Sequence, residues 1–248
     1  MEINKKEIKK NRQKVNNPSA RKELIVQVID VEKNFKIGNS DIQVLKKVSL
    51  NVYKGDFVML IGPSGCGKST LLHVVYGLEP PTKGDVFFLG DSIWRHTKDW
   101  RSEFRNKEIG FIPQQAFWVK SLTVIENVAI PAVIGGLSMK EGLQRATKLL
   151  ELVGMTDWAN YRPYDLSGGQ QQKVAFARSL LLDPKIIIAD EPTGNLDQKS
   201  GSQVMDLIKN FCDQLGVTIL MVTHNSAQHH YATNVVEMLD GVIISQNK

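Results

Sequence analysis

The sequence predicts an α/β fold in which a helical block is inserted into a core of strands and helices. Two continuous apolar runs, "KIIIAD" and "VTILMVTH", are typical of strands buried on both faces of a parallel sheet. A glycine-rich loop, "GPSGCGKST", lies between an apolar strand and a helix. From about residue 115 to 165 the pattern changes to helices and loops. We therefore expect one folded domain, residues 24–248, with a helical subdomain at about 115–165.

The first part of this domain is predicted to be rich in strands. "LIVQVIDV", from Leu24, is dominated by β-branched residues, and "VLKKVSLNVYKGDFVMLIG" predicts two strands with a turn at residues 54–56. "STLLHVVYGL" predicts a helix that ends at Gly77, and "EPPTKGDVFFLGDS" predicts a strand between two turns. Glycines and polar residues thus separate short elements throughout this region.

Two later segments have clear periodicity. "MKEGLQRATKLLELVG" predicts an amphipathic helix with Gly154 at its C-terminal end. Its apolar face comprises Leu143, Ala146, Leu149, Leu150 and Val153. "NVVEMLDGVIIS" predicts a hairpin around Asp240 and Gly241.

The composition favours a globular protein of a reducing compartment. Hydrophobic residues make up 42% of the chain and charged residues 23%, which is ordinary for such proteins. The two cysteines, Cys66 and Cys212, form no spaced pair. The N-terminus has no apolar signal-peptide core, and the longest apolar run, "VAIPAVIGGL", is too short to span a bilayer. We expect neither a secretory signal nor a membrane span.

Residues 1–23 are predicted to be a flexible basic extension. Residues 1–22 hold eight Lys or Arg and two Glu, a net charge of +6, so the total of +5 leaves −1 for the rest. A solvated arm is one interpretation, and contact with anionic lipid headgroups is another. Nucleic-acid binding is disfavoured because the body of the chain has no basic stripe.

The glycine-rich loop matches the phosphate-binding pattern G-x-x-x-x-G-K-[ST] in full. Glycines allow backbone N–H groups to surround a phosphate, and the start of the following helix adds positive potential. Lys68 is expected to reach the β- and γ-phosphates of a nucleotide and Ser69 to bind Mg²⁺. The predicted loop comprises Gly62, Pro63, Ser64, Gly65, Cys66, Gly67, Lys68, Ser69 and Thr70.

Two carboxylates and a histidine follow the two apolar strands. Asp190 and Glu191 stand where "KIIIAD" ends. The first is expected to hold Mg²⁺, and the second to orient or deprotonate the attacking water. His224 ends "VTILMVTH" at the same edge of the sheet, as a candidate γ-phosphate contact. A histidine after a strand can also be structural.

A second phosphate-binding pattern occurs downstream, in "DLSGGQ", residues 165–170. A serine, two glycines and a glutamine precede the predicted helix "QQKVAFARSLL", whose start can hold an anion. The chain thus has two phosphate-binding elements, although it is short for two nucleotide sites.

With these motifs the chain resembles the ATP-binding-cassette (ABC) ATPases over residues 24–245. The resemblance implies a P-loop NTPase of the ABC type, with a mixed-sheet core, an N-terminal antiparallel β subdomain and an inserted helical subdomain. It also implies roles for further residues. Gln114 of the Q-loop is expected on ATP and Mg²⁺ and in catalysis, and Glu191 and His224 are expected as catalytic residues. The other residues implied to bind ATP are Phe35, stacked on adenine, the signature residues Ser167, Gly168, Gly169 and Gln170, and the D-loop residues Asn195 and Asp197.

The resemblance also accounts for the two phosphate-binding elements. In this family two cassettes form a head-to-tail dimer, and each signature closes over the ATP that the other chain holds. We therefore expect a homodimer in the presence of ATP. The implied partners are integral membrane permease subunits on separate chains and a periplasmic or extracellular adaptor, which would place the chain at the cytoplasmic face of the inner membrane.

Within the family, "ENVAIP", "YRPYDLSGGQQQKVAFARSL" and "IIIADEPTGNLD" are similar to the subfamily for lipoprotein release and macrolide export. The implied substrates are lipoproteins, antimicrobials or peptides. Pro113 and Lys173 depart from the phenylalanine and arginine usual there. A regulatory cassette such as that of cell division is the alternative; a translation or DNA-repair cassette is disfavoured. Phe117 and Trp118 are candidate permease contacts, with burial in the core as the alternative.

Overall fold

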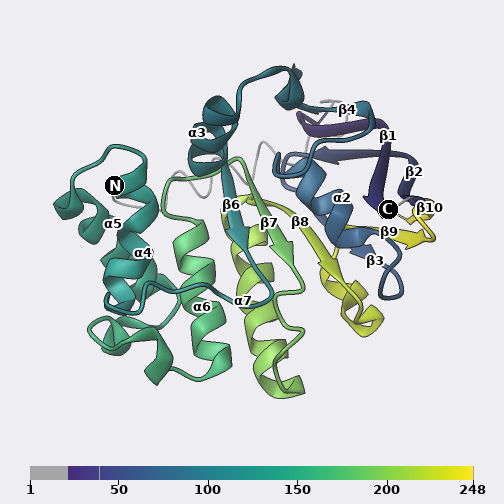
Figure 1. Ribbon diagram of the computed structural model, residues 1–248. Coiled ribbons are helices and arrows are strands. Elements are labelled where there is room, and N and C mark those ends of the chain that lie inside the picture. The colour runs from purple at the N-terminus through teal and green to yellow at the C-terminus, as the bar shows by residue number, and fades with distance from the viewer. Residues whose placement is uncertain (1–21, 39, 248) are drawn as a thin grey trace.

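The computed structural model describes residues 22–38 and 40–247 (Figure 1). Most of the predicted basic extension therefore lies outside the described residues. Within the described part, no helix has the length and apolarity needed to cross a membrane. The strands of the described residues form two sheets, one of four strands and one of six.

The four-stranded sheet is antiparallel, in the order β2-β1-β4-β5. It contains β1 (Leu24–Ile37), β2 (Ser40–Tyr53), β4 (Lys83–Phe88) and β5 (Asp91–Ser92). The turn predicted at residues 54–56 follows β2 and leads into the larger sheet. An antiparallel β unit at the N-terminal end and a mixed-sheet core together confirm the predicted fold class.

The six-stranded sheet has the order β10-β9-β3-β8-β7-β6. It contains β3 (Phe57–Ile61), β6 (Ile109–Ile112), β7 (Ile186–Asp190), β8 (Thr218–Thr223), β9 (Asn234–Leu239) and β10 (Val242–Asn247). Only β10 pairs antiparallel, through the predicted hairpin turn, where Asp240 and Gly241 have φ of 46° and 81°. The apolar runs at β7 and β8 are buried on both faces, as predicted.

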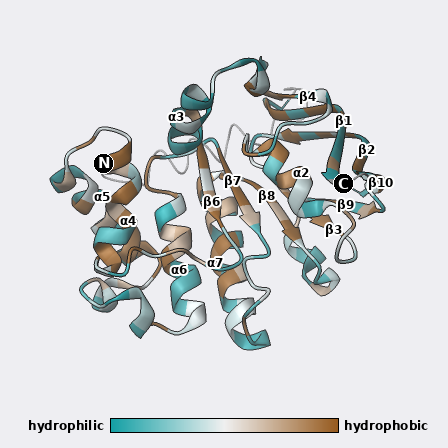
Figure 2. Ribbon diagram, viewed as in Figure 1, coloured by the Kyte–Doolittle hydropathy of each residue, from teal (hydrophilic) through white to brown (hydrophobic). Residues whose placement is uncertain are grey.

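Successive residues along the central strands face two different cores. Met59 and Met221 pack with α6 (Gly168–Ser179) and α7 (Gln198–Leu215). Leu60 and Leu220, one residue further along each strand, pack with α2 (Lys68–Val75) on the other side. Because side chains alternate across a strand, α2 lies on one face of the sheet and α6 and α7 lie on the other. Figure 2 shows hydrophobic stretches running through these strands.

The segment from residue 115 to 165 contains α4 (Val124–Ile134), α5 (Met139–Leu152) and two short 3₁₀ turns, η2 (Thr156–Trp158) and η3 (Pro163–Asp165). Both α-helices begin with a capping box, which satisfies backbone N–H groups at the first turn. On the predicted apolar face of α5, Ala146 and Leu150 are buried. Gly154 follows this helix with a left-handed φ of 68°.

Helices α3 and α7 were not predicted individually from the sequence. Helix α3 (Lys98–Glu108) follows the 3₁₀ turn η1 (Ile93–Arg95) and precedes β6. None of the residues of α3 is fully buried, so no continuous apolar run marks it in the sequence. Trp100 and Phe104 stack with ring centroids 4.8 Å apart, and this i, i+4 pair is one clue to the helix. Thr97, which caps its start, is another. A last 3₁₀ turn, η4 (Ser226–Tyr231), follows β8.

Candidate functional site

The glycine-rich loop joins β3 to α2, and its glycines are required by close backbone contacts. A Cβ on Gly62, where φ is 158°, would lie 2.2 Å from the carbonyl oxygen of Met238. The turn between β9 and β10 also supports the loop, because Gly241 N–H donates to the Cys66 carbonyl at 3.0 Å. The Gly241 carbonyl in turn accepts from Lys46 N–H on β2 at 2.8 Å. The loop is therefore held from behind by the C-terminal hairpin.

Lys68 is the first residue of α2 and is only 5% exposed. Its ammonium donates to the carbonyl oxygens of Gly62 and Pro63, both at 2.9 Å. Gly67 precedes the helix in a left-handed conformation and has no side chain that could cap the first N–H groups. A buried cation and an uncapped helix start thus meet at one loop, an arrangement suited to phosphate.

Ser69 and Asp190 bring a hydroxyl and a carboxylate together below this loop. Ser69 Oγ donates to Asp190 Oδ1 at 3.2 Å. Burial raises the pKa of the Asp190 carboxyl, and the Ser69 hydrogen bond opposes this shift. A partly desolvated carboxylate beside a hydroxyl is a suitable start for a Mg²⁺ site.

Glu191, Gln114 and His224 converge on a single carboxylate oxygen. Oε2 of Glu191 lies 2.9 Å from His224 Nδ1 and accepts from Gln114 Nε2 at 3.4 Å. Glu191 has a left-handed φ of 46°, and its backbone N–H donates to the Val222 carbonyl at 2.9 Å. Such a conformation is costly for a residue other than glycine, so the surroundings fix the direction of this carboxylate.

The signature residues form the N-terminus of α6. Ser167 caps the helix through a capping box: its Oγ accepts from Gln170 N–H at 3.3 Å, and Gln170 Oε1 accepts from Ser167 N–H at 2.8 Å. A Cβ on Gly168 would lie 3.0 Å from Leu196, and one on Gly169 would lie 3.2 Å from Ser200. The glycines therefore allow the predicted D-loop and the start of α7 to pack against this helix start.

The predicted D-loop residues lie on the surface beside the signature. Asn195 and Asp197 are both exposed. Asp197 caps α7, since its Oδ1 accepts from Ser200 N–H at 3.0 Å. The hydrogen bonds from Ser200 lower the pKa of the Asp197 carboxyl, so this side chain remains an anion at neutral pH.

Three aromatic residues singled out from the sequence have different settings. Phe35 is half-buried on β1, with Lys33 Nζ 4.8 Å from its ring centroid. Phe117 is 77% exposed. Trp118 is 8% exposed, so its prediction as a permease contact is wrong and the alternative of burial is correct. Its ring packs in the core, and its N–H has a partner in α6.

Several side chains that position the site were missed by the sequence analysis. Gln172 Nε2 donates to the Gln114 carbonyl at 2.9 Å. Gln228 on η4 donates to Thr193 Oγ1 at 3.0 Å, which joins the segment after His224 to the turn after Glu191. The three successive glutamines "QQQ" in the signature helix were a visible signal for the first contact. No local pattern pointed to Gln228.

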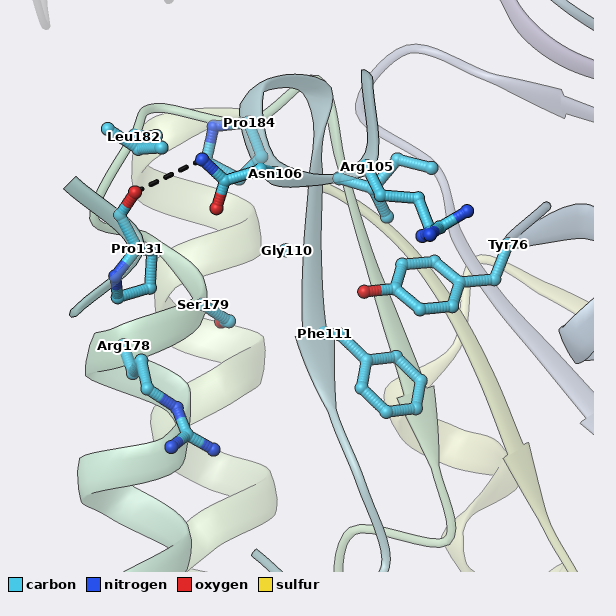
Figure 3. Close-up of a pocket in the computed structure, with 11 residues that line it drawn as sticks. Tyr76, Arg105, Asn106, Gly110, Phe111, Pro131, Arg178, Ser179, Leu182 and Pro184 are labelled. Atoms are coloured by element: carbon cyan, nitrogen blue, oxygen red, sulfur yellow. Dashed lines mark hydrogen bonds between the residues drawn. The ribbon is translucent and has the colours of Figure 1, made fainter. Parts of the chain in front are cut away.

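A cavity of about 180 Å³ opens between the large sheet and the helical segment. Figure 3 shows Tyr76 from the end of α2 and Arg178 from α6 on opposite sides of it, with Phe111 of β6 below Tyr76. The rings of Tyr76 and Phe111 stack with centroids 4.6 Å apart. Burial lowers the pKa of Arg178 to about 10. The cavity thus combines aromatic walls with a cationic side.

Sequence comparison adds independent findings. The ABC transporter family matches residues 45–194. An uncharacterized ABC transporter ATP-binding protein of Methanocaldococcus jannaschii is 44% identical over 89% of this chain and 98% of its own length. The lipoprotein-releasing system ATP-binding protein LolD of Geobacter metallireducens is 38% identical over 89% of this chain and 98% of its own. The macrolide export ATP-binding/permease protein MacB of Chlorobium phaeobacteroides is 39% identical over 90% of this chain and 34% of its own.

Solved structures agree with this result. The dimeric structure of the ABC transporter cassette MJ0796 has a TM-score of 0.83 at 36% identity and covers 90% of this chain and 98% of its own. The same values hold for a dimeric post-hydrolysis state of that cassette bound to ADP and Pi. A P-loop core with a second glycine-rich helix start defines the chain as a nucleotide-hydrolysing protein. It belongs to the ABC transporter family, as an ATP-binding subunit that hydrolyses ATP.

Proposed function

We propose that two copies of this chain assemble head to tail around two ATP molecules and drive a separately encoded membrane permease. One observation carries the dimer: α2 and α6, whose starts both offer backbone N–H groups to an anion, lie on opposite faces of one sheet. A nucleotide held at α2 therefore leaves the start of α6 available to a second chain. The solved dimers of MJ0796, which has the same fold, support this arrangement.

In the proposed site, Lys68 and the loop N–H groups hold the phosphates, and Phe35 stacks on the adenine. Ser69, Asp190 and Gln114 offer the hydroxyl, carboxylate and amide oxygens that Mg²⁺ prefers, and the first two are already adjacent. When bound, Mg²⁺ supplies positive charge that offsets the charge developing on the phosphates. The fit of this donor set to Mg²⁺ supports ATP with Mg²⁺ as the working ligand.

Hydrolysis in this proposal depends on Glu191. Its carboxylate orients the attacking water and accepts its proton, while His224 holds the carboxylate oxygen in place. Ser167, Gly168, Gly169 and Gln170 of the second chain complete the site around the γ-phosphate. Asn195 and Asp197 lie next to this signature and line the junction between chains.

The permease is proposed to dock where the helical segment meets the large sheet. The cavity beside Tyr76 and Arg178 opens there, and the exposed Phe117 follows Gln114 closely in the chain. Docking at this place would let a permease act on the Q-loop residue that faces ATP. The chain would then lie at the cytoplasmic face of the inner membrane as a peripheral subunit, with residues 1–22 near anionic lipid.

The names of two relatives support the substrate class. LolD is named for lipoprotein release and MacB for macrolide export. We infer an export or mechanotransmission complex that handles a lipoprotein, an antimicrobial or a peptide, with a periplasmic or extracellular adaptor as a further component.

Light scattering on the purified chain tests the dimer. With ATP and without Mg²⁺, so that hydrolysis is blocked, the mass should double, whereas with ADP it should stay that of one chain. A single-chain mass under both conditions would contradict the dimer. Co-expression with each candidate permease tests the partner: the correct one should co-purify with the chain and change its ATP turnover. A cassette that finds no permease but binds a cell-division protein would favour the scaffolding alternative.

A further inference from the structure

A buried tryptophan joins the segment after Gln114 to the signature helix. The indole N–H of Trp118 donates to Gln171 Oε1 at 2.9 Å. Gln171 lies in the first turn of α6, and its own N–H donates to the Ser167 carbonyl at 2.9 Å. A short chain of hydrogen bonds therefore connects Trp118 to the signature serine.

Arg178, also on α6, makes a second contact with Trp118. It stands seven residues after Gln171, so both side chains lie on one face of α6. Its guanidinium lies 4.5 Å from the Trp118 ring centroid and donates to the Phe117 carbonyl at 2.8 Å. A cation in this position gains from the ring and from the carbonyl together. Trp118 is thus fixed by its N–H, by its ring and by the carbonyl before it.

We propose that Trp118, Gln171 and Arg178 form a clasp that makes the Q-loop and the signature move as one body, so that ATP at one site of the dimer favours ATP at the other. The inference rests on the proposed head-to-tail dimer. In that dimer Gln114 meets the ATP held by its own chain, whereas Ser167 meets the ATP held by the partner. A rigid link between them inside one chain couples the two sites. Trp118 is a positioning residue, because it is buried and acts through Gln171 and Arg178.

The test breaks the hydrogen bond between Trp118 and Gln171 from both of its partners. Trp118→Phe keeps a buried ring but removes the N–H donor, and Gln171→Met keeps the length of the side chain but removes the acceptor. Trp94→Phe is the matched control, because the buried N–H of Trp94 has no hydrogen-bond partner among the residues that the structure describes. Each variant of the full chain is assayed for ATP turnover against ATP concentration. In a Glu191→Gln background, the ATP concentration that gives half-maximal dimer is measured by light scattering.

We expect sigmoidal turnover for the parent and for Trp94→Phe, and a Hill coefficient that falls toward 1 for Trp118→Phe and Gln171→Met. Half-maximal dimer formation should require roughly 2- to 12-fold more ATP, the effect of one such hydrogen bond. ATP binding to the single chain should not change. The double variant should add little to either single one, since both break the same bond.

Two results would overturn the clasp while leaving the dimer intact. One is a parent that dimerises with ATP but has a Hill coefficient of 1. The other is a Trp118→Phe variant whose Hill coefficient and dimer midpoint equal those of Trp94→Phe. If Glu191→Gln alone fails to dimerise with ATP, the proposed dimer is wrong. The clasp proposal, which depends on the dimer, is then wrong as well. A Trp118→Phe chain that does not fold leaves Gln171→Met, a half-buried surface change, to decide.

Discussion

Oε2 of Glu191 lies 2.9 Å from Nδ1 of His224, and the two residues follow neighbouring parallel strands, β7 and β8. The strand pairing brings the ends of both strands to one edge of the sheet, and the left-handed φ of Glu191 turns its side chain toward the histidine. This contact gives the carboxylate a fixed direction. The contribution of this contact to ATP hydrolysis can be measured with the variants below.

Glu191→Gln should separate ATP binding from hydrolysis. The amide keeps the shape of the side chain but cannot accept a proton from water, so turnover should fall by about 10²- to 10⁴-fold. ATP affinity should stay near that of the parent because Lys68 and Asp190 are unchanged. Lys68→Ala should instead lose binding. Turnover and equilibrium ATP binding check both variants, and near-parent turnover in Glu191→Gln would exclude this residue as the base.

His224→Ala should lower turnover without a comparable loss of ATP affinity. A hydrogen bond to a charged group contributes about 1.5–3 kcal/mol, so the rate should drop by roughly 10- to 150-fold. His230→Ala, a nearby exposed histidine, is the control. Equal rates for the two alanine variants would show that the histidine contact does not position Glu191.

Mixed dimers should rescue an ATP site. A Lys68→Ala chain spoils its own phosphate loop, and a Ser167→Arg chain spoils the signature it offers to a partner. In the heterodimer one site carries both defects and the other carries none. A mixture should therefore trap ATP, whereas neither variant should do so by itself. Retention of labelled ATP on a filter measures this, and no retention in the mixture would contradict the head-to-tail order.

The helical segment should lose stability at acid pH through its capping boxes. Hydrogen bonds from the Thr123 backbone and side chain lower the pKa of Glu126. A lowered pKa means that this contribution is present above the unfolded value of about 4.3 and is lost as the pH falls through the folded value. Glu126→Gln should therefore flatten the acid limb of the stability curve.

Chemical unfolding at a series of pH values measures this effect, with the exposed Glu151→Gln as control. Thr123→Ala should cost about 1 kcal/mol at neutral pH, as other N-cap losses do. An acid limb for Glu126→Gln as steep as that of Glu151→Gln would contradict the assignment.

Deletion of residues 1–21 should leave ATP turnover within about twofold of the parent, a barrier change below ~1 kcal/mol. Lys22 is retained because its ammonium pairs with Asp56 at 2.7 Å. The truncated chain should bind vesicles of anionic lipid less than the parent, with a larger difference at low salt. Vesicle flotation checks this, and equal binding would argue against the lipid contact.

Local signals were enough to predict most of the strands and the phosphate loop, although β6 was not predicted. The apolar runs at β7 and β8 and the loop before Lys68 each combine a local pattern with the flanking elements it requires. Helix α3 was missed because it lies on the surface with a single stacked aromatic pair. Whether Trp118 is buried or exposed could not be decided from the sequence, since its hydrogen-bond partner Gln171 is 53 positions away in the chain. Contacts of that kind are set by tertiary packing, which leaves no periodic trace in the sequence.

The hairpin behind the phosphate loop bears on how the protein is made. Gly241 N–H donates to the Cys66 carbonyl, and the Met238 carbonyl oxygen lies 2.2 Å from where a Cβ of Gly62 would stand. During translation the loop and its strand leave the ribosome long before β9 and β10, so the loop first lacks the backbone that shapes it. A nascent chain stalled before residue 234 should therefore carry the complete loop sequence without its native shape, and nucleotide capture becomes a late event in the life of each newly made molecule.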